Sequence, residues 1–212
     1  MKMKNDNYIL GAHNSLSYLR PKKWWMIPFH WMARCQGVDY KEQYEKYGVK
    51  VFDLRVWFDE DTKELEVRHG VMAFKLSEDG IKEFISYLND KGDCHLRVIL
   101  EEDAINKKSI YASANECLFS AFCEELENEF ENVHFFGGNR KYDWKVMYDF
   151  KGNDVELDDK YSSTTSLFKS SKRWLAVIDD LCPWLYAKLH NKENIKNGTE
   201  KECLFIDFVE LS

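Results

Sequence analysis

The chain of 212 residues has no excess of positive charge and no long apolar run. Its 30 Lys and Arg residues face 37 Asp and Glu residues, which leaves a net charge of -7. This balance argues against nucleic acid as the main partner, because binding a phosphate backbone needs a basic face. A small anionic headgroup needs only one or two local cations. No window approaches the roughly 20 apolar residues of a membrane-spanning helix.

Motifs that are typical of redox, metal-binding or exported proteins are also missing. The six cysteines are scattered and form no CxxC pair, which predicts reduced, mostly buried thiols. Met1 to Asn7 are polar and lack the apolar core of a signal peptide, so we expect a cytoplasmic protein, or a secreted one if a leader has been removed. The composition is typical of a globular chain, and residues 1–212 are expected to form one monomeric domain.

Short apolar runs alternate with amphipathic stretches along the sequence. Ile81, Phe84 and Leu88 mark one helical stripe, and residues 118–126 repeat the pattern. Such alternation predicts parallel strands joined by helical crossovers. We expect an α/β fold, a single compact (β/α)8 TIM-type barrel with helices short or missing between 151 and 172, because the chain is short for this fold. The strand-like runs are 8–13, 50–56, 64–69, 95–100, 132–136, 144–149, 173–178 and 203–209.

Two histidines end two of these predicted strands. His13 follows Gly11-Ala12, small residues that let a ligand approach closely, and His69 is followed by Gly70. In a barrel the active site lies at the C-terminal ends of the strands, so distant residues converge there. Either histidine alone could simply end a strand, but the pair favours acid–base catalysis near neutral pH.

Charged residues within apolar strands offer partners for the two histidines. Asp53 and Arg55 lie two residues apart and point the same way. They form either a salt bridge in the core or a site in which Arg55 faces phosphate oxygens. Asp207 is a lone carboxylate in an apolar strand, and its natural partner is a catalytic histidine held in one tautomer. Glu101 starts an acidic run that we expect to be a solvated loop, with metal binding as the alternative.

The stretch from Lys22 to Met32 is rich in aromatic residues flanked by lysines. That combination is typical of a surface that contacts a membrane interface, and an exposed aromatic patch of this size generally marks an interaction site. The alternatives are a large core element or a substrate lid. The aromatic residues concerned are Trp24, Trp25, Phe29 and Trp31.

These residues together resemble the catalytic X-domain of phosphatidylinositol-specific phospholipases C, the bacterial single-domain kind most of all. The resemblance covers most of the chain, and the order and spacing of the motifs agree. The matching motifs are Gly11-Ala12-His13-Asn14-Ser15, Cys35-Gln36, the run from Tyr47 to Arg55, His69-Gly70, the strand from Leu96 to Glu101, and Ile206-Asp207-Phe208-Val209.

The resemblance implies a reaction and a role for each matching residue. His13 would be the general base on the inositol 2-hydroxyl, with Asp207 orienting it. Arg55 would stabilise charge on the phosphoryl oxygens, and His69 would protonate the leaving diacylglycerol oxygen. The products would be diacylglycerol and a cyclic inositol phosphate. The resemblance further implies transient contact with a membrane surface and, more loosely, contacts to inositol from Asp159 and Tyr161.

Two positions depart from the bacterial pattern. Asn14 stands where bacterial members have an aspartate that supports the second histidine, and Asp53 could supply that carboxylate. The calcium-dependent eukaryotic members share the asparagine but carry two acidic residues on the next strand, where this chain has Asp53 and Arg55. A cation at position 55 would sit where the metal binds, so we predict no metal cofactor. Two alternatives stay open: a calcium- or magnesium-dependent phosphodiesterase using Asn14, Asp53 and Glu101, and an inactive barrel that binds a lipid headgroup or a partner protein.

Overall fold

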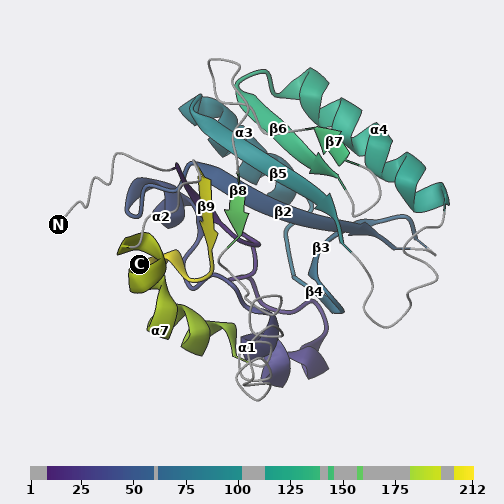
Figure 1. The fold of residues 1–212 in the computed structure, drawn as a ribbon. Helices are drawn as coiled ribbons and strands as arrows, with labels where there is room; N and C mark the ends of the chain where they lie inside the picture. Colours follow the sequence, from purple (N-terminus) through teal and green to yellow (C-terminus); the bar gives the residue numbers. More distant parts are fainter. Residues whose placement is uncertain are drawn as a thin grey trace.

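The computed structural model describes residues 9–59, 62–101, 113–138, 143–145, 157–159, 182–196 and 203–212. A central sheet is covered by helices on its outer side (Figure 1). In chain order the elements are β1 (Ile9–Ala12), η1 (Trp24–Phe29), α1 (His30–Ala33), α2 (Tyr40–Glu45), β2 (Val51–Phe58), β3 (Leu65–His69), β4 (Met72–Ala73), α3 (Gly80–Lys91), β5 (Cys94–Leu100), α4 (Ser113–Glu129), β6 (Val133–Gly138), β7 (Asp143–Lys145), β8 (Leu157–Asp159), α7 (Pro183–Lys196), β9 (Cys203–Ile206) and η2 (Val209–Leu211).

Six parallel strands make up most of the sheet. They follow the order β6-β5-β2-β1-β9-β8, and β7 adds an antiparallel strand beside β6. The first and last described strands, β1 and β9, are therefore neighbours inside the sheet, between β2 and β8. This order brings the carboxyl ends of β1, β2 and β9 to one edge of the sheet.

The predicted α/β class is confirmed, but a closed eight-stranded barrel is not what the described residues form. Within them β7 and β8 end the strand order at opposite edges. The run at 64–69 forms β3, which is antiparallel to β2 rather than a further parallel strand. The connection at 59–64 is too short for the crossover of about a dozen residues that a parallel neighbour needs. The run at 173–178 lies outside the described residues, and β8 lies where only missing helices were expected.

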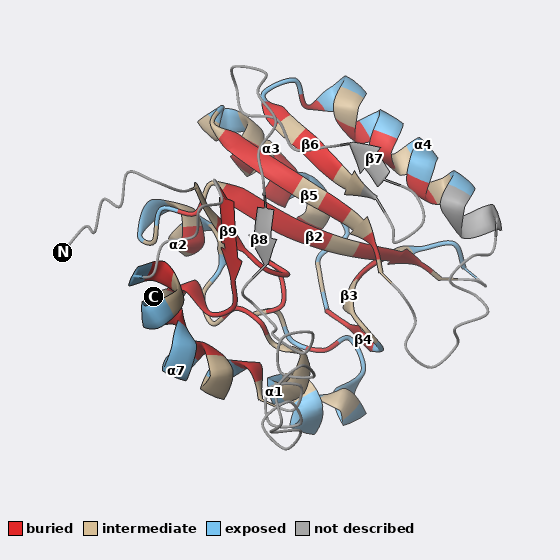
Figure 2. Cartoon of the chain, viewed as in Figure 1, coloured by how far each residue is buried: buried red, intermediate tan, exposed pale blue. Residues whose placement is uncertain are grey.

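The core lies between the sheet and the helices α3 and α4. Strand β2 is buried along its whole length apart from Arg55. The predicted stripe of α3 packs Phe84 and Leu88 fully into the core, and α3 ends at Gly92, whose φ of 69° is a left-handed conformation that glycine adopts at little cost. Figure 2 shows β2, β5 and β9 mostly buried, whereas exposed residues lie on the outer faces of the helices and in the loops.

Other predictions about the chain concern its thiols and membrane helices. All six cysteines lie in the described part, and they carry thiols rather than disulfides. Four of them are buried. Within the described residues, no helix combines the length and apolar character needed to cross a bilayer.

Candidate active site

The first histidine is held between the ends of two neighbouring strands. The register pairs Ala12 with Ile206, so His13 and Asp207 follow at the same level of the sheet. Nδ1 of His13 lies 2.7 Å from the Asp207 carboxylate, and both side chains are buried. Because a carboxylate accepts, the His13 proton lies on Nδ1 and the lone pair lies on Nε2. Asn191 of α7 donates to the Asp207 carbonyl at 2.7 Å and holds that backbone in place.

A buried glutamine fixes the two strand ends relative to each other. The Gln36 amide donates to the carbonyls of His13 at 2.9 Å and Ile206 at 3.1 Å. Its oxygen accepts from the backbone N–H of Val209 at 3.2 Å. One side chain therefore bonds three backbone groups, of which the Ile206 carbonyl also accepts from the His13 N–H at 3.1 Å.

The second histidine reaches the site by a hairpin rather than by a parallel strand. Strand β3 turns back along β2 and brings the His69 ring to 5.4 Å from the His13 ring, centroid to centroid, at an interplanar angle of 86°. Nδ1 of His69 lies 2.9 Å from the Ala33 carbonyl and 3.5 Å from the Cys35 sulfur. The convergence expected of a barrel mouth is thus achieved by a different strand direction.

A guanidinium lies beside the two histidines, between two carboxylates. Arg55 donates from Nε to Asp53 at 2.9 Å and from Nη1 to Glu101 at 3.3 Å. Glu101 also accepts from the Gly70 N–H at 3.0 Å. The expectation that Glu101 starts a solvated loop is wrong, because its side chain is 11% exposed and ion-paired. The salt bridge between Asp53 and Arg55 is therefore present, and the contact of Arg55 with phosphate oxygens stays a prediction.

A second guanidinium near the site was not predicted from the sequence. Arg97 on β5 is in register with Asp53 on β2, so both side chains lie on the same face of the sheet. Arg97 also stacks over the Phe205 ring at 5.4 Å. Burial disfavours the charged form of Asp53, but Arg55 and Arg97 outweigh it and lower the pKa of this carboxyl. The sequence did contain a signal for this residue, because Arg97 is the one Lys or Arg in the apolar run 95–100.

Both histidines are neutral at neutral pH in this environment. Burial lowers the pKa of His13 well below its ordinary value, and the charges of Arg55 and His69 lower it further. Burial also lowers the pKa of His69, although Glu101 opposes the shift. A neutral imidazole with its lone pair on Nε2 can accept a proton, which suits His13 to the role of a base.

The structure shows what surrounds two neighbours of His13, and it corrects the prediction for one of them, Gly11. The small residue Gly11 does not leave room for a ligand: a Cβ there would lie 2.9 Å from the Phe205 ring of β9. Asn14 adopts a positive φ of 42°, its N–H donates to Asp53 at 2.9 Å, and its side chain donates to the Arg68 carbonyl at 3.3 Å. Asn14 therefore contacts the strand that carries His69.

The side chains of the two predicted inositol contacts lie outside the described residues. Asp159 is the last residue of β8, in register with Phe205, and its side chain lies outside the described residues. Tyr161 lies outside them altogether.

The exposed aromatic patch comprises Trp24, Trp25, Ile27, Phe29 and Trp31, all on η1 and α1. Trp24 is 76% exposed and Trp25 is 52% exposed, and neither η1 nor α1 buries a residue, so the alternative of a core element is wrong. The segment is tied to the site by His30, which lies 3.0 Å from the Ser17 carbonyl, and by the Ala33 carbonyl against His69. In Figure 1, α1 lies beside α7.

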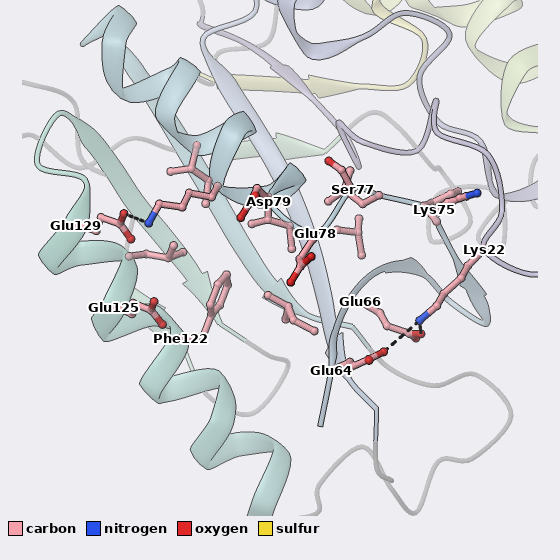
Figure 3. Close-up of a pocket in the computed structure, with 18 of the residues that line it drawn as sticks. Lys22, Glu64, Glu66, Lys75, Ser77, Glu78, Asp79, Phe122, Glu125 and Glu129 are labelled. Carbon is pink, nitrogen blue, oxygen red and sulfur yellow. Dashed lines mark hydrogen bonds and ion pairs between the residues drawn. The ribbon is translucent and has the colours of Figure 1, made fainter. Parts of the chain in front are cut away.

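A separate hollow of about 790 Å³ lies between β3, α3 and α4 (Figure 3). Apolar side chains such as Phe122 line it, and carboxylates surround it. Glu64 and Glu66 pair with Lys22, and Glu129 pairs with Lys82. His13, Asn14, Asp53, Arg55, His69 and Asp207 are all absent from its lining. The hollow is therefore a different place from the histidine site.

The chain is similar to known proteins in its fold. No family model and no curated protein matches the sequence. A double mutant of the phosphatidylinositol-specific phospholipase C from S. aureus is 16% identical, with a TM-score of 0.59 over 94% of this chain and 84% of that chain. A structure concerned with the membrane binding of the same enzyme is also 16% identical, with a TM-score of 0.56 over 97% of this chain and 89% of that chain. The chain thus shares its fold with solved phosphatidylinositol-specific phospholipases C.

Proposed function

We propose that the protein belongs to the phosphatidylinositol-specific phospholipase C family and cleaves phosphatidylinositol, or a similar inositol phosphodiester, by histidine acid–base catalysis. The observation that carries the proposal is the pair of histidine rings 5.4 Å apart, one backed by a carboxylate and both beside a guanidinium. The fold shared with solved enzymes of that family supports the substrate class.

The proposed reaction begins with proton abstraction by His13. Its Nε2 takes the proton of the inositol 2-hydroxyl, while Asp207 stabilises the imidazolium that forms. The alkoxide oxygen attacks phosphorus within the same molecule, so little entropy is lost in bringing the two together. A bond to the cyclic phosphate forms as the bond to the diacylglycerol oxygen breaks.

His69 completes the reaction by giving a proton to the leaving oxygen. This role needs a protonated ring, whereas burial lowers the pKa of His69 in the substrate-free protein. A phosphodiester anion beside the ring would raise that pKa, because an opposite charge stabilises the imidazolium. Protonation of the acid is therefore coupled to substrate binding.

Arg55 would supply positive charge to the phosphoryl oxygens. In the substrate-free protein the Glu101 carboxylate pairs with this guanidinium, and the substrate phosphate would compete for it. The cation also lies between Asp53 and Glu101, the two carboxylates of the alternative calcium site. This placement supports a metal-independent reaction.

The aromatic patch would dock the protein on the membrane that contains its substrate. The exposed tryptophans and the Lys23 ammonium over the Trp25 ring, at 5.6 Å, match the needs of an anionic bilayer interface. Trp24→Ala combined with Trp25→Ala is expected to weaken vesicle binding about tenfold or more, since burying one large apolar side chain is worth about 1.5–3 kcal/mol. Cleavage of a soluble substrate should be retained, and equal loss on both substrates would contradict the docking role.

The test of the proposed function is phosphorus NMR of dispersed phosphatidylinositol with the protein in excess chelator. A cyclic inositol phosphate signal is expected. His13→Ala and His69→Ala should each reduce turnover by a factor of about 10² or more, as loss of an acid or base commonly does. His190→Ala is the matched control, because that ring is exposed on α7. Turnover only after calcium addition would favour the metal-dependent alternative, and vesicle binding without turnover would favour a binding protein.

A further inference from the structure

A buried thiol lies inside the candidate active site and has no part in the acid–base scheme. Cys35 follows α1, and its sulfur lies 3.5 Å from Nδ1 of His69 and 3.6 Å from the Ala33 carbonyl. One ligand atom each of His13, Cys35 and His69 can be chosen so that all three lie within 4.8 Å of one another. These residues form no local motif and meet only through the fold.

One of the three spacings matches that between nitrogen and sulfur ligands on a metal ion, and the other two lie within 4.8 Å. Tetrahedral zinc has bonds of about 2.0 Å to histidine nitrogen and about 2.3 Å to cysteine sulfur, which places two such ligands about 3.5 Å apart. The distance between Cys35 Sγ and His69 Nδ1 is 3.5 Å. Two imidazoles and a thiolate select zinc or cobalt over the hard cations calcium and magnesium.

The surroundings of the three residues hold them in position. The Cys35 N–H donates to Ser17 Oγ at 2.9 Å, and its carbonyl accepts from the Phe208 N–H at 2.6 Å. Asp207 on Nδ1 of His13 reproduces the carboxylate–histidine arrangement that orients metal ligands in other proteins. Because the fold already gathers the three side chains, an ion would need only a small further approach of its ligands.

We propose that His13, Cys35 and His69 form a site for a divalent transition metal of the zinc type, and that metal occupancy and turnover exclude each other. On binding, Cys35 releases its thiol proton, and the ring proton of His69 moves from Nδ1 to Nε2. The metal takes the lone pair that His13 needs as a base. The fourth coordination position remains for water. The exclusion of turnover rests on the proposed function, whereas metal binding does not.

Metal binding is tested on the full chain, freed of metal and titrated with Co²⁺ and then Zn²⁺. One equivalent of Co²⁺ should give tetrahedral d–d absorption and a thiolate-to-cobalt charge-transfer band, and Zn²⁺ should displace it. Loss of an outer partner of a ligand already costs 10–100-fold in affinity, so Cys35→Ser should weaken zinc binding about 100-fold or more and abolish the thiolate band. Cys117→Ser is the control, because that thiol is exposed on α4.

Several results would overturn the metal site. Two of them are the absence of stoichiometric binding and a thiolate band that persists in Cys35→Ser. The third is zinc-edge X-ray absorption of the wild type that shows no sulfur at about 2.3 Å, the length of a zinc–thiolate bond. The absorption measurement needs no variant, so it applies even where Cys35→Ser does not fold.

Turnover in the same samples separates the two proposals. Cleavage in chelator that stops with one equivalent of Zn²⁺ in the wild type, but continues in Cys35→Ser, would support both. Metal binding without any turnover in chelator would leave the metal site intact and refute the proposed function. Turnover that rises with Zn²⁺ would overturn the exclusion.

Discussion

Replacing Asp207 by asparagine keeps the shape of the side chain and removes its charge from Nδ1 of His13. The carboxylate accepts from Nδ1 at 2.7 Å in a buried setting. A hydrogen bond to a charged group contributes about 1.5–3 kcal/mol, which corresponds to about 10- to 150-fold in rate. The asparagine amide also offers a donor to Nδ1 and so favours the tautomer with the proton on Nε2, which cannot act as the base. We expect kcat to fall by about 10² to 10⁴, as wrong-tautomer variants of such pairs do.

The assay for Asp207→Asn is the release of cyclic inositol phosphate from a soluble substrate, with the ring nitrogens of His13 followed by nitrogen NMR. The matched control is Asp93→Asn, which removes a partly exposed carboxylate that pairs with Lys50 away from the site. In a His13→Ala background, Asp207→Asn should add little further loss, because both act through one ring. A kcat within threefold of wild type, or a full additional loss in that background, would refute the reasoning.

Three further predictions concern stability and the anion site. The folded pKa of His13 lies below its unfolded value of about 6.5, so the unfolded state binds more protons between the two values. The free energy of unfolding should therefore fall on acidification below pH about 6.5, by up to about 1.4 kcal/mol per pH unit. Urea unfolding of His13→Asn should show a flatter dependence on pH, and an unchanged dependence would contradict the pKa shift. Gly11→Ala should lower the free energy of unfolding by about 1–3 kcal/mol, because the new Cβ meets an aromatic ring. In Gly70→Ala the new Cβ meets no atom within 4 Å, and the expected loss of about 1–2 kcal/mol comes from the positive φ. Equal melting points for Gly11→Ala and wild type would contradict the contact at Gly11. Glu101→Gln should remove one of the ion pairs of Arg55 and so tighten binding of an inositol phosphate, measured by calorimetry. Weaker binding that calcium restores would instead make Glu101 a metal ligand.

Local patterns were enough to predict most of the strands and the buried faces of α3 and α4. The apolar stripe through Phe84 and Leu88 predicted α3, because helical periodicity is read within a few turns. His13 and His69 could be paired because each ends an apolar run. Their meeting follows from strand ends gathering at one edge of a sheet, even though β3 runs in the opposite direction.

Features that depend on distant contacts could not be predicted. Cys35 looked like any buried thiol, since its proximity to His69 arises only when α1 packs beside the hairpin. Gly11 was assigned to ligand access because the Phe205 ring that fills the space lies on the last strand. Glu101 was taken for solvated loop because its ion pair with Arg55 spans two strands.

The position of β9 between β1 and β8 has a consequence for how the protein is made. His13 and Asp207 are 194 positions apart, and β1 stays unpaired along one edge until β9 is inserted between it and β8. During synthesis the N-terminal strands emerge first, so the growing chain exposes an open edge that can pair with other chains. The base and the carboxylate that holds it therefore come together only after the last strand has left the ribosome. A nascent chain, or one cut before β9, would carry both histidines and still lack the group that orients the first.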